Sequence, residues 1–390
     1  MLSRPLWAPS SPPRALSLLA FTLLACCDGA RYPNALRRSH LAPAAGVSNR
    51  GAHSRVGILV LIFTQRDNEQ RRQWQRNSWL KQKWQHGELR PSQAGERPRV
   101  SWRYVYVMAR DDLSDAATLD QLQGDGVTLS AVRESYAHLV YKTVEAVRWA
   151  LHHVAFGALL KTDDDTIVHI GRAAAWLRYQ STEVARVTAA ARLRQSSGAP
   201  AAVQHADVGV DSVAAGVPPL LYAGRVFNDS QVIRANFSKA DLLHPEWFPD
   251  DFVKWAVPFE SYDGFYYPPY CSGGGYMLGA DSARRIVAAY DVRVAAKRPV
   301  VRVEDAFVGI LAAESGVAPT NLADYMQDPP AGRRQDPSLF GGRILVHRVV
   351  EPENAFKWII YAVKTPWSSH KRRLSGLDPA RTHRRRNGGR

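Results

Sequence analysis

Cysteine is scarce in this chain of 390 residues, which contains three. Cys26 and Cys27 lie near the N-terminus, and Cys271 stands alone in the rest of the chain. The region from residue 56 to residue 370 therefore cannot form the internal disulfide framework that stabilises many small secreted domains. A hydrophobic core has to stabilise it instead, and a composition of 45% hydrophobic residues supplies enough apolar surface for one.

Long apolar runs are also missing. The best candidate for a membrane or targeting segment is residues 15–27, which follow Arg4 and Arg14. At 13 residues it has the length of a signal-peptide hydrophobic region rather than of a full membrane span. We predict that residues 1–28 form a signal peptide or a short signal anchor, with a disordered leader as the alternative. Residues 29–55, rich in Pro, Arg and Ala, are predicted to be a stem or linker.

Acidic residues are too few to balance the basic ones, and the net charge is +15. The excess lies at the ends, with +6 in residues 1–55 and +7 in residues 371–390, which leaves +2 for residues 56–370. A folded nucleic-acid-binding face would carry its charge in the central region, so we predict no nucleic-acid partner. Like-charged blocks are usually disordered, and residues 371–390 are predicted to form a basic disordered tail.

The sequence has no phosphate-binding GxxxxGK[ST] motif and no internal repeat, which argues against a P-loop nucleotide hydrolase and against a solenoid. What it does have is an alternation of apolar, β-branched segments with helical ones. In chain order we predict a strand over 56–63, a helix over 68–84, strands over 100–108 and 127–131, a helix over 136–154, a strand from residue 156, and a helix around 171–179. This order predicts an α/β fold in which helices cover a sheet.

The second half of the chain begins with a change in character. Residues 181–219 lack aromatic residues and a firm period, and we predict an inserted mobile loop there. Structure is expected to resume at Leu220. Residues 247–276 are then dense in aromatic side chains, which are predicted to divide between core packing and stacking walls for a sugar.

Three consecutive carboxylates, Asp163, Asp164 and Asp165, follow the strand-like segment at residues 156–160. Adjacent acids repel one another, so a cation is expected between them, and carboxylate oxygens suit Mg²⁺ or Mn²⁺. In open α/β sheets, ligands bind beyond the carboxyl ends of strands. Asp163 and Asp165 would point the same way along an extended segment. The alternative is a solvated acidic turn.

Three further features carry candidate chemistry. Gly273, Gly274 and Gly275 let a backbone approach a ligand closely, or form a flexible loop. Glu304 and Asp305 open an apolar helix, either as helix caps or with one of them as a general base toward a sugar hydroxyl. His347 follows a predicted strand, where it is either a packed residue or a late metal ligand.

Five segments, in order and with the right spacing, resemble the β-1,3-glycosyltransferases of glycosyltransferase family 31, which include galactosyl- and N-acetylglucosaminyltransferases. The segments are residues 71–79, 134–143, 161–165, 267–276 and 304–309. Gln75 stands where the family usually has an aliphatic residue. The resemblance covers about residues 56–350, and the loop at 181–219 and the low cysteine count leave the acceptor open.

The resemblance implies a GT-A fold with one catalytic domain over residues 56–370. It implies an inverting transfer of a hexose or N-acetylhexosamine, with galactose favoured, from a UDP-sugar to the 3-hydroxyl of a glycan on protein or lipid. Mn²⁺, or Mg²⁺, would be the cofactor, and the expected location is the Golgi membrane as a single-pass type II protein. Two alternatives are a non-catalytic glycan-binding or chaperone-like relative and a phosphoryl-transfer enzyme.

The family's functional residues carry over to matching positions of this chain. Asp305 matches the general base, with Glu304 beside it. Asp165 matches the main metal ligand, Asp163 a second ligand that also reaches the ribose, and His347 a late one. The remaining matches belong to the nucleotide-sugar site and are Arg72, Arg76, Lys142, Asp164, Gly274 and Gly275.

Overall fold

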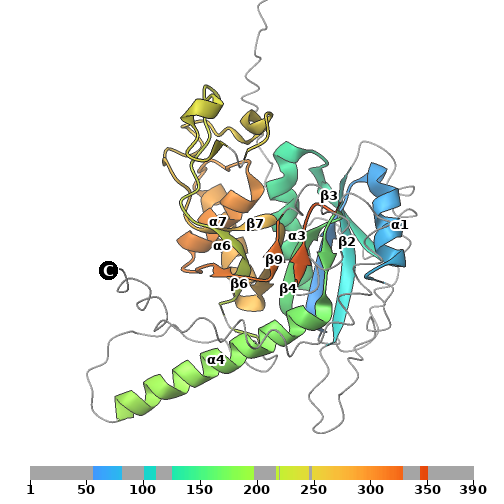
Figure 1. The fold of residues 1–390 in the computed structure, drawn as a ribbon, viewed down its shortest axis with the longest axis vertical. Helices are drawn as coiled ribbons and strands as arrows, with labels where there is room; N and C mark the ends of the chain where they lie inside the picture. The colour runs from blue at the N-terminus through green and yellow to red at the C-terminus, as the bar shows by residue number, and fades with distance from the viewer. Residues whose placement is uncertain are drawn as a thin grey trace, which may run out of the picture. The chain divides into compact units, whose positions relative to one another are not determined.

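The computed structural model describes residues 56–80, 101–110, 125–196, 217–218, 220–245, 248–327 and 343–349 (Figure 1). The predicted signal or anchor segment, the stem and the basic tail lie outside these residues, as do residues 197–216 of the predicted loop. Among the helices of the described ranges, none combines the length and the apolar character that crossing a bilayer requires.

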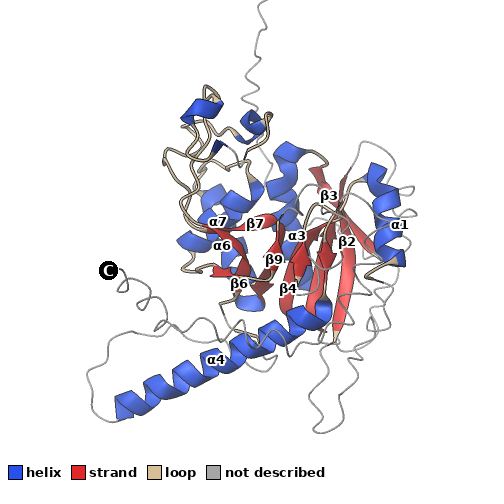
Figure 2. Cartoon of the chain, viewed as in Figure 1, coloured by secondary structure: helices blue, strands red, loops and turns tan. Residues whose placement is uncertain are grey.

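A mixed sheet of seven strands forms the centre of the described part, in the order β3-β2-β1-β4-β7-β6-β8 (Figure 2). Strands β3, β2, β1 and β4 run parallel, and β7 pairs antiparallel with both β4 and β6. The bounds are β1 Val56–Phe63, β2 Trp102–Arg110, β3 Gly126–Arg133, β4 Phe156–Asp163, β6 Tyr222–Phe227, β7 Tyr270–Gly279 and β8 Thr320–Asn321. A three-stranded sheet, β5-β10-β9, is built from β5 Ile167–Val168, β9 Tyr325–Met326 and β10 Leu345–Val346.

Helices cover both faces of the large sheet, as an α/β fold requires. On one face, β1 contributes Leu59 and Leu61 to a core shared with α3 (Leu139–His153), α6 (Ala280–Ala295) and α7 (Glu304–Glu314). On the other face, Ile58, Val60 and Ile62 join the first turns of α4 (Ile170–Ser196). Because β1 is buried on both faces, its residues are apolar without alternation. The predicted α/β class is confirmed.

The predicted helices exist, with changed ends. The segment expected over 68–84 starts with a 3₁₀ turn at Arg66–Asn68 and continues as α1, Glu69–Asn77, and the segment expected over 136–154 starts with the 3₁₀ turn Tyr136–His138 before α3. The start of the predicted loop is wrong, because α4 continues through Ser196. Its second half, residues 184–196, is rich in Ala and Arg, which favour helix. Residues 181–190 are half-buried or exposed, so no buried apolar stripe marked them in the sequence.

The glycine-bearing segment forms strand β7, which excludes the flexible loop that was the alternative to a close backbone approach. In the register with β4, Thr162 lies opposite Gly275 and Lys161 lies opposite Tyr276. Glycine is depleted in strands, so propensity argued against this assignment. A glycine inside a strand often marks a close approach of another group. The pairing brings the three glycines to the end of β4, where the acidic triplet begins.

Candidate active site

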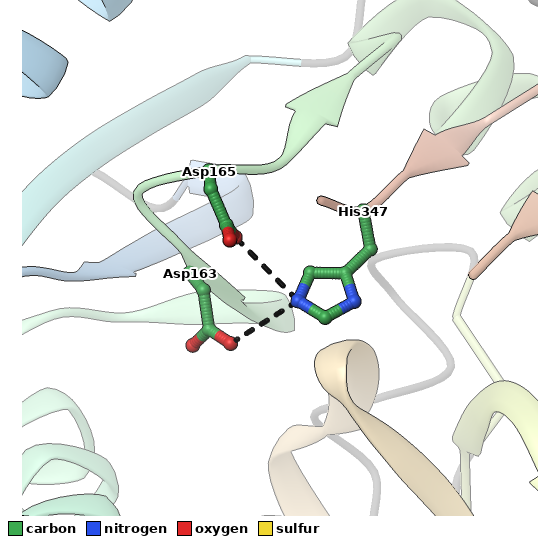
Figure 3. Close-up of side chains that lie close together, drawn as sticks. All are labelled: Asp163, Asp165 and His347. Atoms are coloured by element: carbon green, nitrogen blue, oxygen red, sulfur yellow. Dashed lines mark ion pairs between the residues drawn. The ribbon is translucent and has the colours of Figure 1, made fainter. Parts of the chain in front are cut away.

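Asp163, Asp165 and His347 come together although His347 is far from the other two in sequence (Figure 3). Asp163 is the last residue of β4, and β5 begins just after the triplet. β10 pairs antiparallel with β5, which places His347 beside the acids. His347 Nε2 lies 3.5 Å from Asp165 Oδ1 and 3.8 Å from Asp163 Oδ2. Both carboxylates point toward the same edge of the imidazole. The reason differs from the prediction, because the segment is not extended: β4 ends at Asp163, and Asp164 and Asp165 form a turn closed by a hydrogen bond from the Thr166 amide to the Asp163 carbonyl at 3.2 Å.

The chemistry of this group fits a divalent cation. Asp165 Oδ1 is buried and accepts no hydrogen bond from the described residues. Burial raises the pKa of Asp165, and the charges of Asp163 and Asp164 raise it further, whereas His347 opposes the shift. A cation would satisfy the orphaned oxygen and offset the repulsion between the acids. Carboxylates suit Mg²⁺ and Mn²⁺ alike, and the imidazole nitrogen favours the transition metal.

Asp164, the middle acid, has different partners. Its Oδ2 accepts hydrogen bonds from Thr64 Oγ1 at 2.7 Å and Asn68 Nδ2 at 2.8 Å. Its Oδ1 pairs with Arg71 at 3.0 Å. These contacts tie the triplet to the corner between β1 and α1. Asp164 therefore holds the turn after β4 against the start of α1. Its contact with the nucleotide-sugar stays a prediction.

Lys161 is a fully buried cation between the acids, and its part in the site was missed in the sequence. Its Nζ donates to Asp163 Oδ1 at 2.7 Å and to the carbonyl of Gly273 at 2.5 Å, and lies 3.8 Å from Glu304 Oε2. Burial alone would lower the pKa of Lys161, but Asp163 and Glu304 outweigh it and raise the pKa. The side chain thus stays charged and holds Asp163 in place. A lysine inside an otherwise apolar strand was the available signal.

The acidic pair lies at the N-terminus of α7. Asp305 is partly exposed, and its Oδ2 accepts the Gly273 amide at 3.0 Å while its Oδ1 accepts the Ala306 amide at 2.9 Å. Burial raises the pKa of Asp305, and these two hydrogen bonds oppose the shift. The bonds orient the carboxylate and leave each oxygen a further lone pair. Of the two acids, Asp305 is the one that an incoming molecule can reach.

Glu304 is buried beside it. Its Oε1 accepts hydrogen bonds from Thr143 Oγ1 and Tyr276 OH, both at 2.9 Å. Burial raises the pKa of Glu304 to about 7, helped by the nearby negative charges of Asp305 and Asp163 and opposed by Lys161. Because Glu304 is buried, a substrate cannot reach it. Its hydrogen bonds connect the start of α7 to α3 and β7 beneath the site.

This raised pKa makes stability depend on pH. Between its usual pKa of 4.5 and about 7, Glu304 holds a proton in the folded protein that the unfolded chain has released. Stability is therefore lost as the pH rises through that window. Glu304→Gln cannot ionise, so it should gain stability relative to wild type over the window, by at most about 3 kcal/mol. Thermal unfolding of both proteins at the two ends of the window tests this, and a stability difference independent of pH would contradict it.

Gly274 lets the His347 ring take its position. A Cβ at Gly274 would overlap Cγ of that ring. Gly274→Ala is therefore expected to displace the imidazole and to weaken Mn²⁺ binding by about tenfold or more, the size found when supports of metal ligands are lost. The matched control is Gly275→Ala, whose Cβ would meet a terminal methyl of Leu345 at 3.1 Å, which can shift. Equal Mn²⁺ affinities of the two variants would show that Gly274 has no such role.

Two of the predicted nucleotide-binding cations meet at the carboxyl end of β1. Arg72 is fully buried and donates to Thr64 Oγ1 at 3.1 Å and to the carbonyls of Gln65 and Arg66. Lys142 Nζ donates to the Thr64 carbonyl at 2.8 Å and pairs with Glu134 at 2.8 Å. Through Thr64 both lie close to Asp164.

Arg76, the third predicted cation, has a different environment. It pairs with Asp125 at 2.8 Å and lies over the ring of Tyr106 at 5.0 Å. The structure therefore brings Arg72 and Lys142 to the acidic triplet. Arg76 instead forms an ion pair with Asp125, the residue just before β3. Contacts of all three with UDP stay predictions.

The imidazole of His347 has a partner on its other side that the sequence did not reveal. Gln327 Nε2 lies 3.1 Å from His347 Nδ1, and Ser272 Oγ donates to Gln327 Oε1 at 2.5 Å. Gln327 follows β9, which pairs with β10. Only that pairing brings it to His347, so no local pattern identifies it.

The chain is similar in sequence to known glycosyltransferases. Residues 215–323 match the galactosyltransferase family. Human beta-1,3-galactosyltransferase 4 is 32% identical over 219 residues, which are 53% of this chain and 48% of that protein. Mouse N-acetyllactosaminide beta-1,3-N-acetylglucosaminyltransferase 4 is 32% identical over 117 residues, 29% of this chain and 31% of that protein. The chain thus spans about half the length of the galactosyltransferase it matches, and less of the other.

One similar solved structure is that of the galactosyltransferase LgtC in complex with donor and acceptor sugar analogs. The two sequences are 11% identical, and the alignment covers 80% of this chain and 99% of the LgtC chain with a TM-score of 0.34. The fold class rests on the sheet described above and not on this likeness. The family match and the curated relatives confirm the resemblance seen in the sequence. Residues 215–323 of this chain thus resemble the galactosyltransferase family, and the chain is similar to β-1,3-galactosyltransferases and β-1,3-N-acetylglucosaminyltransferases.

Proposed function

We propose that this chain transfers a hexose or N-acetylhexosamine, with galactose favoured, from a UDP-sugar to the 3-hydroxyl of an acceptor glycan with inversion. One observation carries the proposal. The candidate cation ligand Asp163 and the candidate base Asp305 are joined through Lys161 and the backbone of Gly273. A group that neutralises a leaving diphosphate and a group that takes a proton are therefore held in one rigid arrangement.

The donor side of the site would be built by Asp163, Asp165 and His347. Mn²⁺, or Mg²⁺, bound there would supply positive charge that stabilises the departing diphosphate. Lys161 keeps Asp163 oriented toward that position, and Asp164 fixes the turn that carries both ligands. Arg72, Lys142, Gly274 and Gly275 line the same end of the sheet and are proposed to contact the nucleotide-sugar.

The acceptor side would rest on Asp305. Its carboxylate is held by the amides of Gly273 and Ala306 and is partly open to solvent. We propose that an Asp305 oxygen takes the proton of the acceptor 3-hydroxyl. The oxygen of that hydroxyl attacks the anomeric carbon from the face opposite UDP, and the bond between this carbon and the UDP oxygen breaks. Burial raises the pKa of Asp305, which makes it a better base than a solvated aspartate.

Aromatic side chains between β6 and β7 supply a surface for the acceptor. Of the aromatic residues predicted for this region, Tyr267 and Tyr276 are buried, whereas Phe259, Phe265 and Tyr266 are 56%, 77% and 49% exposed. Arg234 holds this segment through the carbonyls of Val257, Tyr262 and Gly264, each at 2.8 Å. Exposed rings on a braced segment can stack on the apolar faces of sugar rings, and we propose this role for them.

The further parts of the proposal concern the setting of the enzyme. We propose an acceptor glycan on protein or lipid, and attachment to the Golgi membrane through residues 1–28 with the catalytic domain in the lumen. Residues 1–28 lie outside the described residues. The support for this part of the proposal is therefore the apolar N-terminal run and the family resemblance.

The test is an assay of the full chain against a panel of UDP-sugars, with Mn²⁺ or with EDTA. Mn²⁺-dependent release of UDP from one sugar, increased by a suitable glycan acceptor, would support the proposal and identify the donor. Absence of UDP release from every donor, together with absence of Mn²⁺-dependent UDP binding, would overturn it in favour of a non-catalytic glycan-binding relative.

A further inference from the structure

The imidazole of His347 is held from three sides. Its Nε2 faces Asp163 and Asp165 (Figure 3), and its ring packs on Gly274, where a side chain would overlap it. The backbone amide of His347 donates to the carbonyl of Met326 at 2.9 Å. With Nε2 facing the two acids, the ring directs its Nδ1 at Gln327.

Gln327 is itself part of a hydrogen-bonded chain. Ser272 Oγ donates to Gln327 Oε1 at 2.5 Å, and Tyr325 OH donates to Ser272 Oγ at 3.4 Å. Ser272 and Tyr325 are buried. This series of hydrogen bonds therefore runs from Tyr325 through Ser272 and Gln327 to His347 Nδ1, and most of it is shielded from water.

This chain of contacts exists in two polarities, because an amide keeps nearly the same shape when its oxygen and nitrogen change places. In the first, Gln327 donates to Nδ1, and the single proton of a neutral imidazole is on Nε2. In the second, Nδ1–H donates to Gln327 Oε1, Gln327 donates to Ser272 Oγ, and the Ser272 hydroxyl donates to Tyr325. Gln327 and Ser272 each have a donor and an acceptor in both polarities, whereas the Nε2 lone pair of the second has a partner only when a cation is bound.

The two polarities differ in what His347 offers to the acids. In the first, an N–H points toward Asp163 and Asp165 and leaves no lone pair for a cation. In the second, the Nε2 lone pair points toward them. A histidine ligand needs that free lone pair, and the hydrogen bond of its other nitrogen fixes which nitrogen carries the proton.

We propose that Gln327 sets the tautomer of His347, and that its amide turns to accept from Nδ1–H when the site takes up a divalent cation. The inference rests on the metal site of the proposed function. It adds Gln327, which does not bind the cation itself but positions the ligand His347. A glutamine suits this role because a neutral amide serves either polarity, whereas a glutamate would only accept and methionine would do neither.

The first measurement is Mn²⁺ affinity, by the electron paramagnetic resonance signal of free Mn²⁺, for the full chain and two variants. Gln327→Met keeps the length of the side chain and removes both hydrogen bonds, and is expected to weaken binding by about tenfold or more. Gln327→Glu holds Nδ1–H in place and is expected to bind at least as tightly as wild type. Thermal unfolding of each variant checks that it folds, and His347→Ala gives the affinity without the imidazole.

The second measurement is the ¹⁵N chemical shift of the His347 ring, identified by its absence in His347→Ala, with Zn²⁺ as a diamagnetic probe. Wild type is expected to carry its proton on Nε2 without the ion and on Nδ1 with it, and Gln327→Glu is expected to carry it on Nδ1 in both states. A proton on Nε2 in the Zn²⁺-loaded wild type would overturn the inference, and this result needs only wild type to be folded.

Failure of the inference can be told apart from failure of the proposed function. If Gln327→Met binds Mn²⁺ as tightly as wild type while wild type releases UDP in the presence of Mn²⁺, the inference is wrong and the function stands. If wild type neither binds Mn²⁺ nor releases UDP from any donor, both are wrong.

Discussion

Asp305→Asn is expected to lower kcat for sugar transfer by roughly 10²- to 10⁴-fold, the range that a positioned general base contributes. The amide has nearly the size of the carboxylate and cannot take a proton from the acceptor hydroxyl. Affinity for UDP should not change, because Asp305 contacts the Gly273 and Ala306 amides and none of the candidate cation ligands. The measurement is steady-state transfer with saturating donor and acceptor, alongside UDP binding.

A matched control exists in the first turn of another helix. Asp281 is the second residue of α6, as Asp305 is of α7, and it pairs with Arg284 at 2.6 Å. Asp281→Asn should therefore reproduce any general effect of losing an acid at a helix N-terminus and leave kcat unchanged. Near-normal turnover by Asp305→Asn would refute its role as base and leave helix capping as its function.

Asp165→Ala is expected to remove Mn²⁺-dependent UDP release, lowering the rate by about 10²- to 10³-fold or more, the cost of losing one group that stabilises developing charge. Asp165 is the better choice of the two flanking acids. Its Oδ1 has no hydrogen-bond partner among the described residues, so its removal breaks no hydrogen bond there and loses only the 3.5 Å contact with His347 Nε2. Asp163→Ala would also leave the buried Lys161 without its closest acid, and loss of stability would confuse the result.

The variant can be compared with Asp291→Ala, which removes an exposed acid of α6 that pairs with Arg148 at 2.7 Å. That change should alter neither Mn²⁺ affinity nor UDP release. Asp165→Ala should also raise thermal stability slightly in the absence of Mn²⁺, because burial and the neighbouring acids disfavour the charged Asp165 side chain. Mn²⁺-dependent UDP release at the wild-type rate would exclude Asp165 as a ligand.

Much of the fold could be predicted from short-range patterns. The apolar run of β1, the amphipathic pattern of α3 and the β-α-β-β-α-β order each depend on neighbouring residues and were found as predicted. Predictions failed where local signals were weak or opposed the tertiary environment. None of residues 181–190 of α4 is buried. Strand β7 contains three consecutive glycines, which are tolerated because β4 and β6 pair with it on both sides.

The site divides in the same way. The sequence by itself determined which residues carry candidate chemistry, since three adjacent acids, an acidic pair at a helix start and a histidine after a strand are local features. Tertiary structure alone decided which of them meet. The β5–β10 pairing brings His347 to Asp163 and Asp165, the β4–β7 register places Gly273 between Lys161 and Asp305, and β9 brings Gln327 to the imidazole. These contacts join residues more than a hundred positions apart, or lie in parts of the chain without a motif, and strand pairing and core packing set them.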